Sequence, residues 1–368
     1  MNKIYDLQSI AEKFNLEGKF KRTENHICGH INDTFILICE DENYKEVKYV
    51  LQRINSNIFK KPWEVMENIH KVTSHLRNKI IEENGDPSRE TLNIVKTKDG
   101  GNLYKDENGN YFRVFNFIEG ASTYQIVEKP EHLYTAGKAL GKFQKQLCDF
   151  DASNLYETIP DFHNTKKRFD AFLEAVKNDE FKRAEEVKEE IEFVLNREKD
   201  TRVLVELIEE NKLPLRVTHN DTKFNNIMID NKTGEGIALI DLDTVMPGLS
   251  LYDFGDSIRS GATTALEDEV DLEKVKFDLE LYKNFTKGFL ENARDFLTEE
   301  EVSYLPFSAK LMTFECGMRF LTDYLMGDVY FKIHRDKHNL DRARNQFKLV
   351  SDMEKEIDSM KNIVYSFI

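Results

Sequence analysis

The pattern of hydrophobic and polar positions divides the chain into a strand-rich N-terminal part and a helix-rich remainder. Residues 34–38 and 48–52 are β-branched and aromatic runs of strand length, and the turn-forming residues 41–43 separate them. Residues 111–118 form another such run. Between these runs, residues 62–69 begin with Pro and carry apolar residues at helical spacing, which predicts one helix among the strands.

Beyond Gly120, the apolar residues recur at the spacing of helices. In residues 134–148 they fall on one face, which predicts a helix. Residues 165–212 are highly charged, but their apolar positions recur at i, i+3, i+4 and i+7. We expect two or three amphipathic helices there, with charge runs such as Glu185-Glu186 exposed to solvent; binding of a partner is the alternative for these charges. Residues 270–368 also have a helical pattern.

The clearest chemical motif lies in residues 217–229, which read as a strand, a polar loop and a second strand. The loop presents His219, Asp221, Lys223 and Asn226 at the H-x-D-x-K-x-x-N spacing of a phosphoryl-transfer loop. Asp221 is the predicted general base, which accepts the proton of the substrate hydroxyl. Asn226 is a predicted Mg²⁺ ligand on the phosphates of ATP. Lys223 is either a catalytic cation near the γ-phosphate or an ordinary solvated lysine, and His219 is predicted to be a packed scaffold residue.

A third strand, residues 237–243, ends in carboxylates. Asp241 follows Asn226 by 15 positions, a separation that fits a hairpin of two short strands, so Asp241 is the predicted second Mg²⁺ ligand. Asp243 is either a further metal contact or a structural acceptor. Asp253 begins an Asp-Phe-Gly motif typical of protein kinases, but it lies 27 positions after Asn226, which is too far for that hairpin. We predict that Asp253 braces the catalytic loop instead.

A small β-rich part, a larger helical part and a strand-loop-strand catalytic insert are the plan of the protein-kinase fold. The sequence therefore predicts an α+β, bilobal protein-kinase-like fold. We expect a nucleotide-binding lobe at residues 1–119 and a catalytic and acceptor-binding lobe at residues 120–368, which includes the charged helical segment 165–212. The connection at Glu119-Gly120 is the predicted hinge, where the backbone of Glu119 meets the edge of adenine.

The first glycine-bearing turn, residues 26–35, is placed to lay backbone N–H groups over phosphates. Asn32 and Thr34 are therefore candidate nucleotide contacts. His30, at the tip of this turn, is expected to point into the cleft between the lobes.

The strand lysine of kinases is not evident in this sequence. Gln52 or Arg53 occupies its expected place, and Gln52 is a candidate nucleotide contact. Glu67, on the following helix, is expected to pair with a basic residue of the segment 48–53.

Composition excludes several classes of protein. Hydrophobic residues make up 40% of the chain, with 7 Pro and 17 Gly, so extensive disorder is not expected. The formal net charge of −15 disfavours binding to nucleic acid. The N-terminal residues do not form a signal peptide, and no run of about 18 apolar residues predicts a membrane span. We expect a cytoplasmic protein; the sequence does not indicate its oligomeric state.

Cysteine and histidine spacing indicates neither a disulfide framework nor a zinc site. The four cysteines are scattered and lack a CxxC pair, which fits a reducing compartment. His334 and His338 lie four positions apart without a third ligand nearby, so we predict surface histidines.

Five blocks of this sequence resemble the aminoglycoside phosphotransferase and choline kinase superfamily of small-molecule kinases, and most closely its N-acetylhexosamine 1-kinases. The resemblance runs from residue 26 to about residue 331. The blocks are residues 29–35, 50–55, 218–223, 240–248 and 314–325. The catalytic blocks are specific for phosphotransfer, whereas the first and last carry the inference of a sugar kinase.

The resemblance implies ATP- and Mg²⁺-dependent phosphorylation of the anomeric hydroxyl of N-acetylglucosamine or N-acetylgalactosamine. It also implies that His30, Arg319 and Tyr330 contact the sugar together with Asp221. Arg and His donate to hydroxyl and acetamide oxygens, and a Tyr ring covers an apolar sugar face. From the residues alone, Arg319 is equally suited to an i,i+4 salt bridge with Glu315.

Two other functions stay open at this point. One is a kinase for another small alcohol: choline, which needs an aromatic cage, an aminoglycoside, which needs carboxylates, or a different sugar. The other is a catalytically silent nucleotide-binding protein, against which the complete set of Asp221, Asn226 and Asp241 argues. The charged segment 165–212 is placed to reshape the acceptor pocket, so the exact sugar is not fixed.

Overall fold

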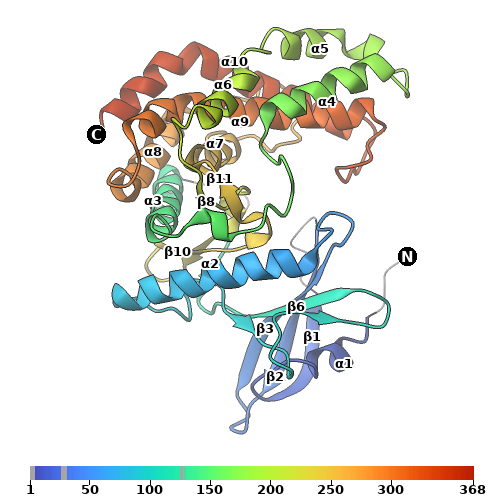
Figure 1. Cartoon of the computed structure of the whole chain (residues 1–368), viewed down its shortest axis with the longest axis vertical. Coiled ribbons are helices and arrows are strands. Elements are labelled where there is room, and N and C mark those ends of the chain that lie inside the picture. Colours follow the sequence, from blue (N-terminus) through green and yellow to red (C-terminus); the bar gives the residue numbers. More distant parts are fainter. Residues whose placement is uncertain (1–4, 26–30, 125–126, 128) are drawn as a thin grey trace.

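The computed structural model describes residues 5–25, 31–124, 127 and 129–368. A six-stranded sheet forms its N-terminal region, and a larger, mostly helical region follows (Figure 1). The strands pair in the order β1-β2-β3-β6-β4, and β5 pairs with β6. They are β1 (Lys19–Asn25), β2 (Asp33–Glu40), β3 (Glu46–Ile54), β4 (Ile94–Val95), β5 (Tyr104–Lys105) and β6 (Tyr111–Asn116). This α+β arrangement confirms the predicted fold class.

The two strands predicted at residues 34–38 and 48–52 are β2 and β3, which pair antiparallel. The strand predicted at residues 111–118 ends at Asn116. The predicted helix is α2 (Pro62–Glu82), with Pro at its first turn, and it follows the short helix α1 (Leu7–Ala11). The buried face of α2 belongs to the same hydrophobic cluster as the C-terminal helices, so α2 joins the sheet to the helical region.

The helical region consists of helices around a three-stranded sheet and a two-stranded sheet. The helices are α3 (Pro130–Gln146), α4 (Thr165–Asn178), α5 (Lys188–Leu195), α6 (Asp200–Glu209), α7 (Ser250–Gly261), α8 (Leu279–Ala293), α9 (Glu299–Leu325) and α10 (His338–Tyr365). The strands are β7 (Ala121–Ser122), β8 (Arg216–Thr218), β9 (Ile227–Asp230), β10 (Gly236–Leu239) and β11 (Met246–Gly248). The three-stranded sheet has the order β10-β9-β7, and the two-stranded sheet consists of β11 and β8. Single 3₁₀ turns are η1 (Ala152–Asn154), η2 (Ala184–Val187), η3 (Phe224–Asn226) and η4 (Leu242–Thr244). The helix predicted in residues 134–148 is confirmed as α3. Those predicted in residues 165–212 are α4 to α6, and those predicted in residues 270–368 are α8 to α10.

Close packing of α3 against α8 depends on two glycines. A Cβ at Gly137 would clash with the backbone oxygen of Phe285, and a Cβ at Gly288 would clash with that of Tyr134. The two helices approach each other closely because these positions carry no side chain. This contact fixes α3, which carries Gln144 to the catalytic loop.

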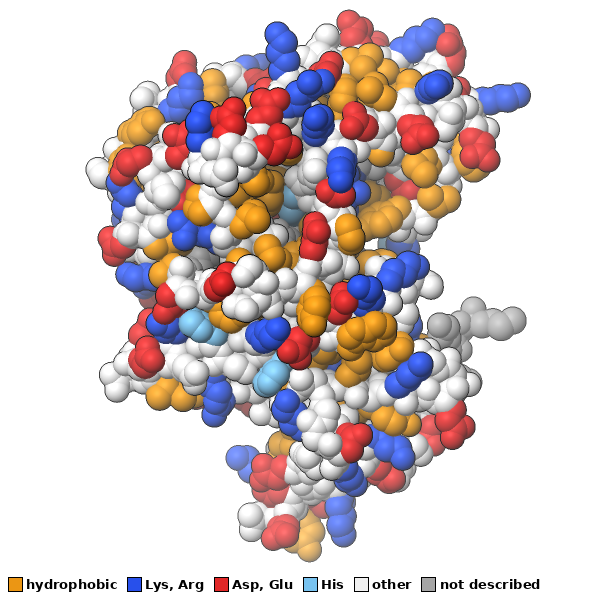
Figure 2. Space-filling view, in the orientation of Figure 1, with side chains coloured by type: hydrophobic (Ala, Val, Ile, Leu, Met, Phe, Trp, Pro, Cys, Tyr) orange, Lys and Arg blue, Asp and Glu red, His pale blue; other side chains and the backbone are white. Residues whose placement is uncertain are grey.

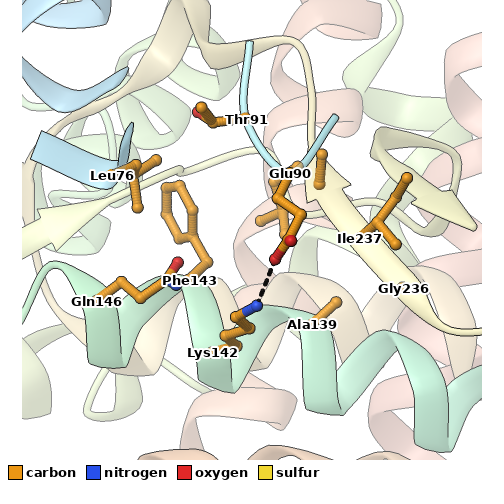
Figure 3. A pocket seen from close by; sticks show the side chains of 11 residues that line it. Leu76, Glu90, Thr91, Ala139, Lys142, Phe143, Gln146, Gly236 and Ile237 are labelled. Atoms are coloured by element: carbon orange, nitrogen blue, oxygen red, sulfur yellow. Dashed lines mark hydrogen bonds and ion pairs between the residues drawn. The ribbon is translucent and has the colours of Figure 1, made fainter. Parts of the chain in front are cut away.

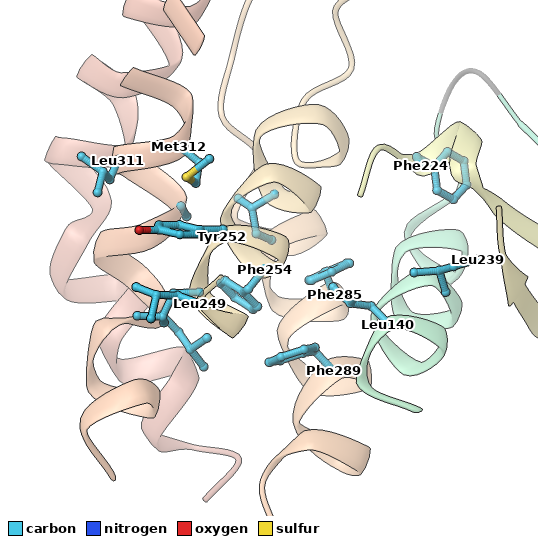
Figure 4. Close-up of a cluster of buried hydrophobic side chains, with 14 of the residues drawn as sticks. Leu140, Phe224, Leu239, Leu249, Tyr252, Phe254, Phe285, Phe289, Leu311 and Met312 are labelled. Carbon is cyan, nitrogen blue, oxygen red and sulfur yellow. The ribbon is translucent and has the colours of Figure 1, made fainter. Parts of the chain in front are cut away.

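The main core lies between α3, α7, α8 and α9. Phe254 of α7 packs its ring against those of Phe285 and Phe289 of α8, with centroids 5.6 and 5.2 Å apart (Figure 4). Such edge-on aromatic contacts restrict the position of α7. Asp253, next to Phe254, is held in place by this packing.

Surface features bear on three of the predictions. None of the helices in the described residues is long and apolar enough to cross a membrane. Acidic and basic side chains are mixed over the face seen in Figure 2. Among the described residues, Cys39, Cys148 and Cys316 are free thiols.

One prediction about surface residues needs correction. His338, at the start of α10, is only 2% exposed, because its ring accepts the N–H of His334 and bonds to Asp268. It is not the surface histidine that the sequence predicted. Glu185 and Glu186 are exposed, as predicted, and Glu186 also accepts hydrogen bonds from Tyr324 and Lys337.

Candidate active site

The catalytic loop lies between two β-pairs. β8 pairs with β11 before the loop, and β9 pairs with β10 after it. In the second pair Ile227 lies opposite Leu239, and the N–H of Ile240 donates to the backbone oxygen of Asn226 at 2.9 Å. This hairpin brings Asn226 and Asp241 to the same end, as the 15-residue separation predicted.

Asp253 braces the loop, as the sequence predicted. Its carboxylate accepts the backbone N–H groups of His219 at 3.0 Å and Asn220 at 2.7 Å, and Gln144 donates to it at 2.9 Å. The hydroxyl of Thr222 donates to the Asp253 backbone oxygen at 2.6 Å. Burial outweighs the lowering effects of His219 and of these donors, so the pKa of Asp253 lies above its usual value. The carboxylate is fully buried, so its hydrogen bonds fix the loop backbone.

His219 is a packed scaffold residue with no exposed surface. Its Nε2 donates to the backbone oxygen of Ile240 at 2.9 Å, and its Nδ1 accepts the N–H of Asp221 at 3.2 Å. Those two bonds select one neutral tautomer. The ring therefore joins the loop to the metal-side strand and offers no free nitrogen for acid–base work.

Asp221 and Lys223 form an ion pair, with Nζ 2.8 Å from Oδ1. Burial raises the pKa of Asp221, but the nearby charge of Lys223 and its hydrogen bond outweigh burial and hold this pKa below its usual value. The Asp221 charge in turn raises the pKa of Lys223. Asp221 is thus ionised at neutral pH, as a proton acceptor must be, and Lys223 is not an isolated surface lysine.

Asn226 and Asp241 offer oxygen ligands on the other side of Asp221. The Asn226 amide nitrogen donates to the Asp221 backbone oxygen at 2.8 Å and to Oδ2 at 3.2 Å, so its Oδ1 points elsewhere and accepts no hydrogen bond from the described residues. Asp241 adopts the left-handed conformation, with φ of 61°. Crowding by protein, together with the charges of Asp243 and Asp221, raises the pKa of Asp241 to about 7.

This arrangement fits a divalent cation. Carboxylate and amide oxygens are the ligands that Mg²⁺ prefers, and a cation would relieve the repulsion between the carboxylates. Within the described part of the chain, no group of three or more His, Cys, Asp or Glu side chains forms a ready-made metal cage. Two protein ligands completed by phosphates and water are the usual arrangement for Mg²⁺.

Asp243 is held from the N-terminal region. Arg113 of β6 lies 2.5 Å from its Oδ1, and the Asn32 amide donates to Oδ2 at 2.6 Å. The side chains of Arg113 and Asp243 are 1% and 5% exposed, so this is a buried ion pair. Asp243 therefore serves as a structural acceptor between the two regions; its contact with a metal stays a prediction.

Arg113 is the functional candidate that the sequence predictions missed. It donates from Nε and Nη2 to Oε1 of Gln52 at 3.0 and 2.8 Å, and the Gln52 amide donates to the Thr34 hydroxyl at 3.1 Å. The sequence signal for it was a single charged residue inside an otherwise mostly apolar strand. Because an unpaired Arg is costly to bury, such a residue indicates a buried partner. Arg113 and Gln52 are register partners on β6 and β3, so the buried cation lies one strand away from the expected place.

The predicted pairing of Glu67 is wrong. Glu67 pairs with Lys71 on its own helix at 3.5 Å, whereas Arg53 bonds to Asp33 at 2.6 Å. Arg53 points along its own sheet because Asp33 is its register partner on β2. Lys48, the other basic residue of β3, lies 3.6 Å from Glu119, so both basic side chains of this strand pair with carboxylates other than Glu67.

The connection between the regions is fixed by Arg89, which donates to the Glu119 backbone oxygen at 3.1 and 3.0 Å and to Asp230 at 2.8 Å. The backbone oxygen of Gly120 accepts the N–H of Asn231 at 2.9 Å. Ile118 makes no hydrogen bond through its backbone with the described residues. The contact of Glu119 with adenine stays a prediction, and His30 lies outside the described residues.

Arg319 projects from α9 among the rings of Phe162, Tyr330 and Phe331, with its guanidinium carbon 5.2, 5.9 and 5.6 Å from their centroids. Its nearest carboxylate oxygen, on Glu315, is 4.0 Å away. Glu315 instead bonds to the buried His163 at 2.8 Å. The i,i+4 salt bridge with Glu315 is thus present but long, and Arg319 donates no hydrogen bond within the described part of the chain.

A small crevice of about 20 Å³ lies behind the catalytic hairpin between α2, α3 and β10 (Figure 3). The ion pair of Glu90 with Lys142, at 2.6 Å, crosses it. None of the predicted site residues lines this pocket. It is therefore separate from the candidate active site.

The chain belongs to the phosphotransferase enzyme family APH, which it matches over residues 29–286, more than half of its length. The prediction of a small-molecule phosphotransferase that acts on an alcohol group is thereby confirmed.

Solved structures with the same fold cover nearly the whole chain. An aminoglycoside phosphotransferase from Alicyclobacillus acidocaldarius is 14% identical, with a TM-score of 0.64 over 100% of this chain and 98% of that one. A microcompartment-associated aminopropanol kinase is 13% identical, with a TM-score of 0.58 over 96% and 98%. An ethanolamine kinase from Plasmodium vivax is 18% identical, with a TM-score of 0.56 over 88% and 82%. At these identities the likeness shows the fold.

We predict that Asp241→Asn raises the thermal stability of the ligand-free protein at about pH 8. The folded-state pKa of about 7 exceeds the value of about 3.9 in an unfolded chain. The folded state therefore resists ionisation and loses stability as pH rises from about 4 to about 7. Asparagine removes this cost and tolerates the left-handed backbone. Because Asp241 is exposed, solvent screening keeps the gain small. Thermal melts at about pH 5 and pH 8 should show the larger gain at pH 8.

Asp243→Asn is the matched control. It removes the charge that balances buried Arg113, so we expect a loss of about 3 kcal/mol in the free energy of unfolding. An Asp241→Asn protein that melts at or below the wild-type temperature at about pH 8 would contradict this account of the carboxylates.

Proposed function

We propose that this protein transfers the γ-phosphate of ATP to the anomeric hydroxyl of an N-acetylhexosamine, giving the sugar 1-phosphate. The observation that carries the proposal is the braced loop that presents Asp221 between a cation and an oxygen-ligand pair. Family membership supports the phosphotransfer. The sequence blocks that resemble N-acetylhexosamine 1-kinases support the sugar.

In the proposed reaction, the sugar hydroxyl oxygen attacks the γ-phosphorus while the bond from that phosphorus to the bridging oxygen of ADP breaks. The hydroxyl proton passes to the carboxylate of Asp221, which is ionised and fixed within its loop. Lys223, 2.8 Å from Asp221, lies where a positive charge stabilises the transferred phosphoryl group.

Asn226 and Asp241 are the proposed Mg²⁺ ligands, and Asp243 lies behind them. The metal would supply charge neutralisation on the nucleotide phosphates. The open Asn226 oxygen and the crowded carboxylates support this assignment.

Arg113 takes the place of the missing strand lysine in this proposal. Arg113 is a buried cation that lies opposite Gln52 in the sheet, and its guanidinium contacts the carboxylate of Asp243. A positive charge in that place is suited to orient phosphates across the cleft. Asn32, Thr34 and Gln52 then act mainly by holding Arg113 and Asp243, and the backbone near Glu119 receives adenine.

The surroundings of Arg319 favour a neutral, oxygen-rich acceptor over a cationic one. Three aromatic rings form the kind of cage that a quaternary amine needs, but the guanidinium of Arg319 already occupies it. Its free N–H donors suit hydroxyl and carbonyl oxygens. The structural neighbours are named for aminopropanol, ethanolamine and aminoglycosides, which are amine-bearing alcohols. The positive charge of Arg319 would repel the positive charge of such acceptors.

We further propose residues 1–119 as the nucleotide lobe and residues 120–368 as the acceptor lobe. A cytoplasmic location is proposed from the scattered cysteines.

The substrate is tested by Mg²⁺-dependent ADP release across a panel of acceptors: N-acetylglucosamine, N-acetylgalactosamine, glucose, galactose, choline and kanamycin. We expect turnover with the N-acetylhexosamines. Asp221→Asn should lower kcat by about 10² to 10⁴, because the proton acceptor is lost, without lowering the affinity for Mg-ATP. Asp358→Asn, an 88% exposed carboxylate on α10, is the matched control and should behave as wild type. Turnover confined to choline or kanamycin, or near-normal turnover by Asp221→Asn, would refute the proposal.

The role of Arg113 is tested by moving its charge to the neighbouring strand. Arg113→Gln should lower kcat/KM for ATP by about 10²-fold, as loss of one charge-stabilising donor does. The double variant Gln52→Lys with Arg113→Gln returns a cation to the register partner and should recover at least about tenfold of this loss. A folded Arg113→Gln protein with unchanged ATP kinetics would show that Arg113 is purely structural.

A further inference from the structure

The loop after α9, residues 326–331 and here called the acceptor loop, carries two of the rings around Arg319. Asp323, only 4% exposed, fixes its backbone by accepting the N–H groups of Val329, Tyr330 and Phe331 at 2.9, 2.8 and 2.9 Å. The Tyr330 side chain is 52% exposed. The loop is thus held by backbone contacts, while one of its rings faces solvent beside Arg319.

The loop between α4 and α5 grips this acceptor loop from outside; residues 179–186 are here called the clamp. Arg183 donates from Nη1 to the backbone oxygen of Tyr324 and to Oδ2 of Asp328, both at 2.6 Å. Its guanidinium carbon lies 4.4 Å from the centroid of the Tyr324 ring. The ring of Phe181 covers Gly327 so closely that a Cβ there would clash with it.

The clamp itself has a defined shape. Asp179 ends α4 in the left-handed conformation, and its Oδ1 accepts the N–H groups of Arg183 at 2.8 Å and Ala184 at 3.0 Å. At the other end, Glu186 accepts from the Tyr324 hydroxyl and from Lys337 at 2.8 Å. Arg183 is therefore presented to the acceptor loop by a fixed turn.

Charge and burial make Arg183 the central contact of this clamp. The Asp328 side chain is 6% exposed and that of Arg183 is 24% exposed, so their ion pair is largely shielded from solvent. Asn339 of α10 donates to both Asp323 and Asp328, at 2.9 and 2.8 Å. Removing Arg183 would leave Asp328 without its cation and remove this polar contact between the clamp and the acceptor loop.

We propose that the clamp determines acceptor binding at a distance, with Arg183 as a positioning residue that fixes Tyr330 and Phe331 around Arg319. This inference rests on the proposed function, because it assigns the acceptor to the surroundings of Arg319. It gives the charged segment 165–212 a role: the segment braces the wall of the acceptor pocket.

The test compares Arg183→Met, Arg183→Lys and the control Arg202→Met. Arg202 lies on α6 in the same charged segment, and its only ion pair among the described residues is an exposed one with Glu198. We expect Arg183→Met to raise KM for N-acetylglucosamine about tenfold, since misplaced binding groups lose affinity, with kcat and KM for ATP within about twofold of wild type. Arg183→Lys should retain most of the affinity, because both hydrogen bonds come from one nitrogen.

Hydrogen exchange of the ligand-free proteins supplies a readout independent of catalysis. Arg183→Met should speed exchange in residues 326–331 and leave the catalytic loop unchanged. Unchanged acceptor KM and unchanged exchange would overturn the inference, as would a uniform loss of kcat and of affinity for both substrates. If the wild type does not phosphorylate N-acetylglucosamine, the proposed function fails, and exchange in residues 326–331 alone still decides whether the clamp holds the loop.

Discussion

A buried carboxylate that receives two backbone N–H groups holds the catalytic loop in shape. Asp253 accepts from His219 and Asn220 and is itself fixed by Gln144 and by the packing of its neighbour Phe254. Hydrogen bonds to a charged group are worth about 1.5–3 kcal/mol each, and between β8 and the 3₁₀ turn η3 the loop has no regular secondary structure to replace them. The aromatic core of α7 and α8 is thereby linked directly to the position of the proposed base.

A second buried charge pair joins the sheet region to the helical region. Asp243 follows the catalytic hairpin, and Arg113 reaches it from the middle of β6. Both charges are buried, so removing one partner would leave an uncompensated charge. The same pair therefore contributes both to the relative placement of the two regions and to the electrostatics of the proposed phosphate site.

Local patterns predicted much of this molecule because they act over short distances. The 15-residue separation of Asn226 and Asp241 predicted the β9–β10 hairpin. Asp253 lies too far along the sequence for that hairpin, which predicted its bracing role. Arg113 was missed because its partners Gln52 and Asp243 are 61 and 130 positions away in the sequence, and only the sheet register brings them together. His338 was misassigned for a similar reason, since Asp268, 70 positions away, buries it. Contacts between the clamp and the acceptor loop are likewise long-range and carry no short motif.

In the proposed complex, Asp221 faces the acceptor hydroxyl while Asn226 and Asp241 hold the metal. A crystal structure of the ternary complex with Mg²⁺, a non-hydrolysable ATP analogue and N-acetylglucosamine tests it most directly. We expect the sugar anomeric hydroxyl within hydrogen-bond distance of the Asp221 carboxylate, Mg²⁺ on the side-chain oxygens of Asn226 and Asp241, and Arg319 in contact with the sugar. Metal bound by Asp253, or a sugar bound away from Asp221, would contradict it.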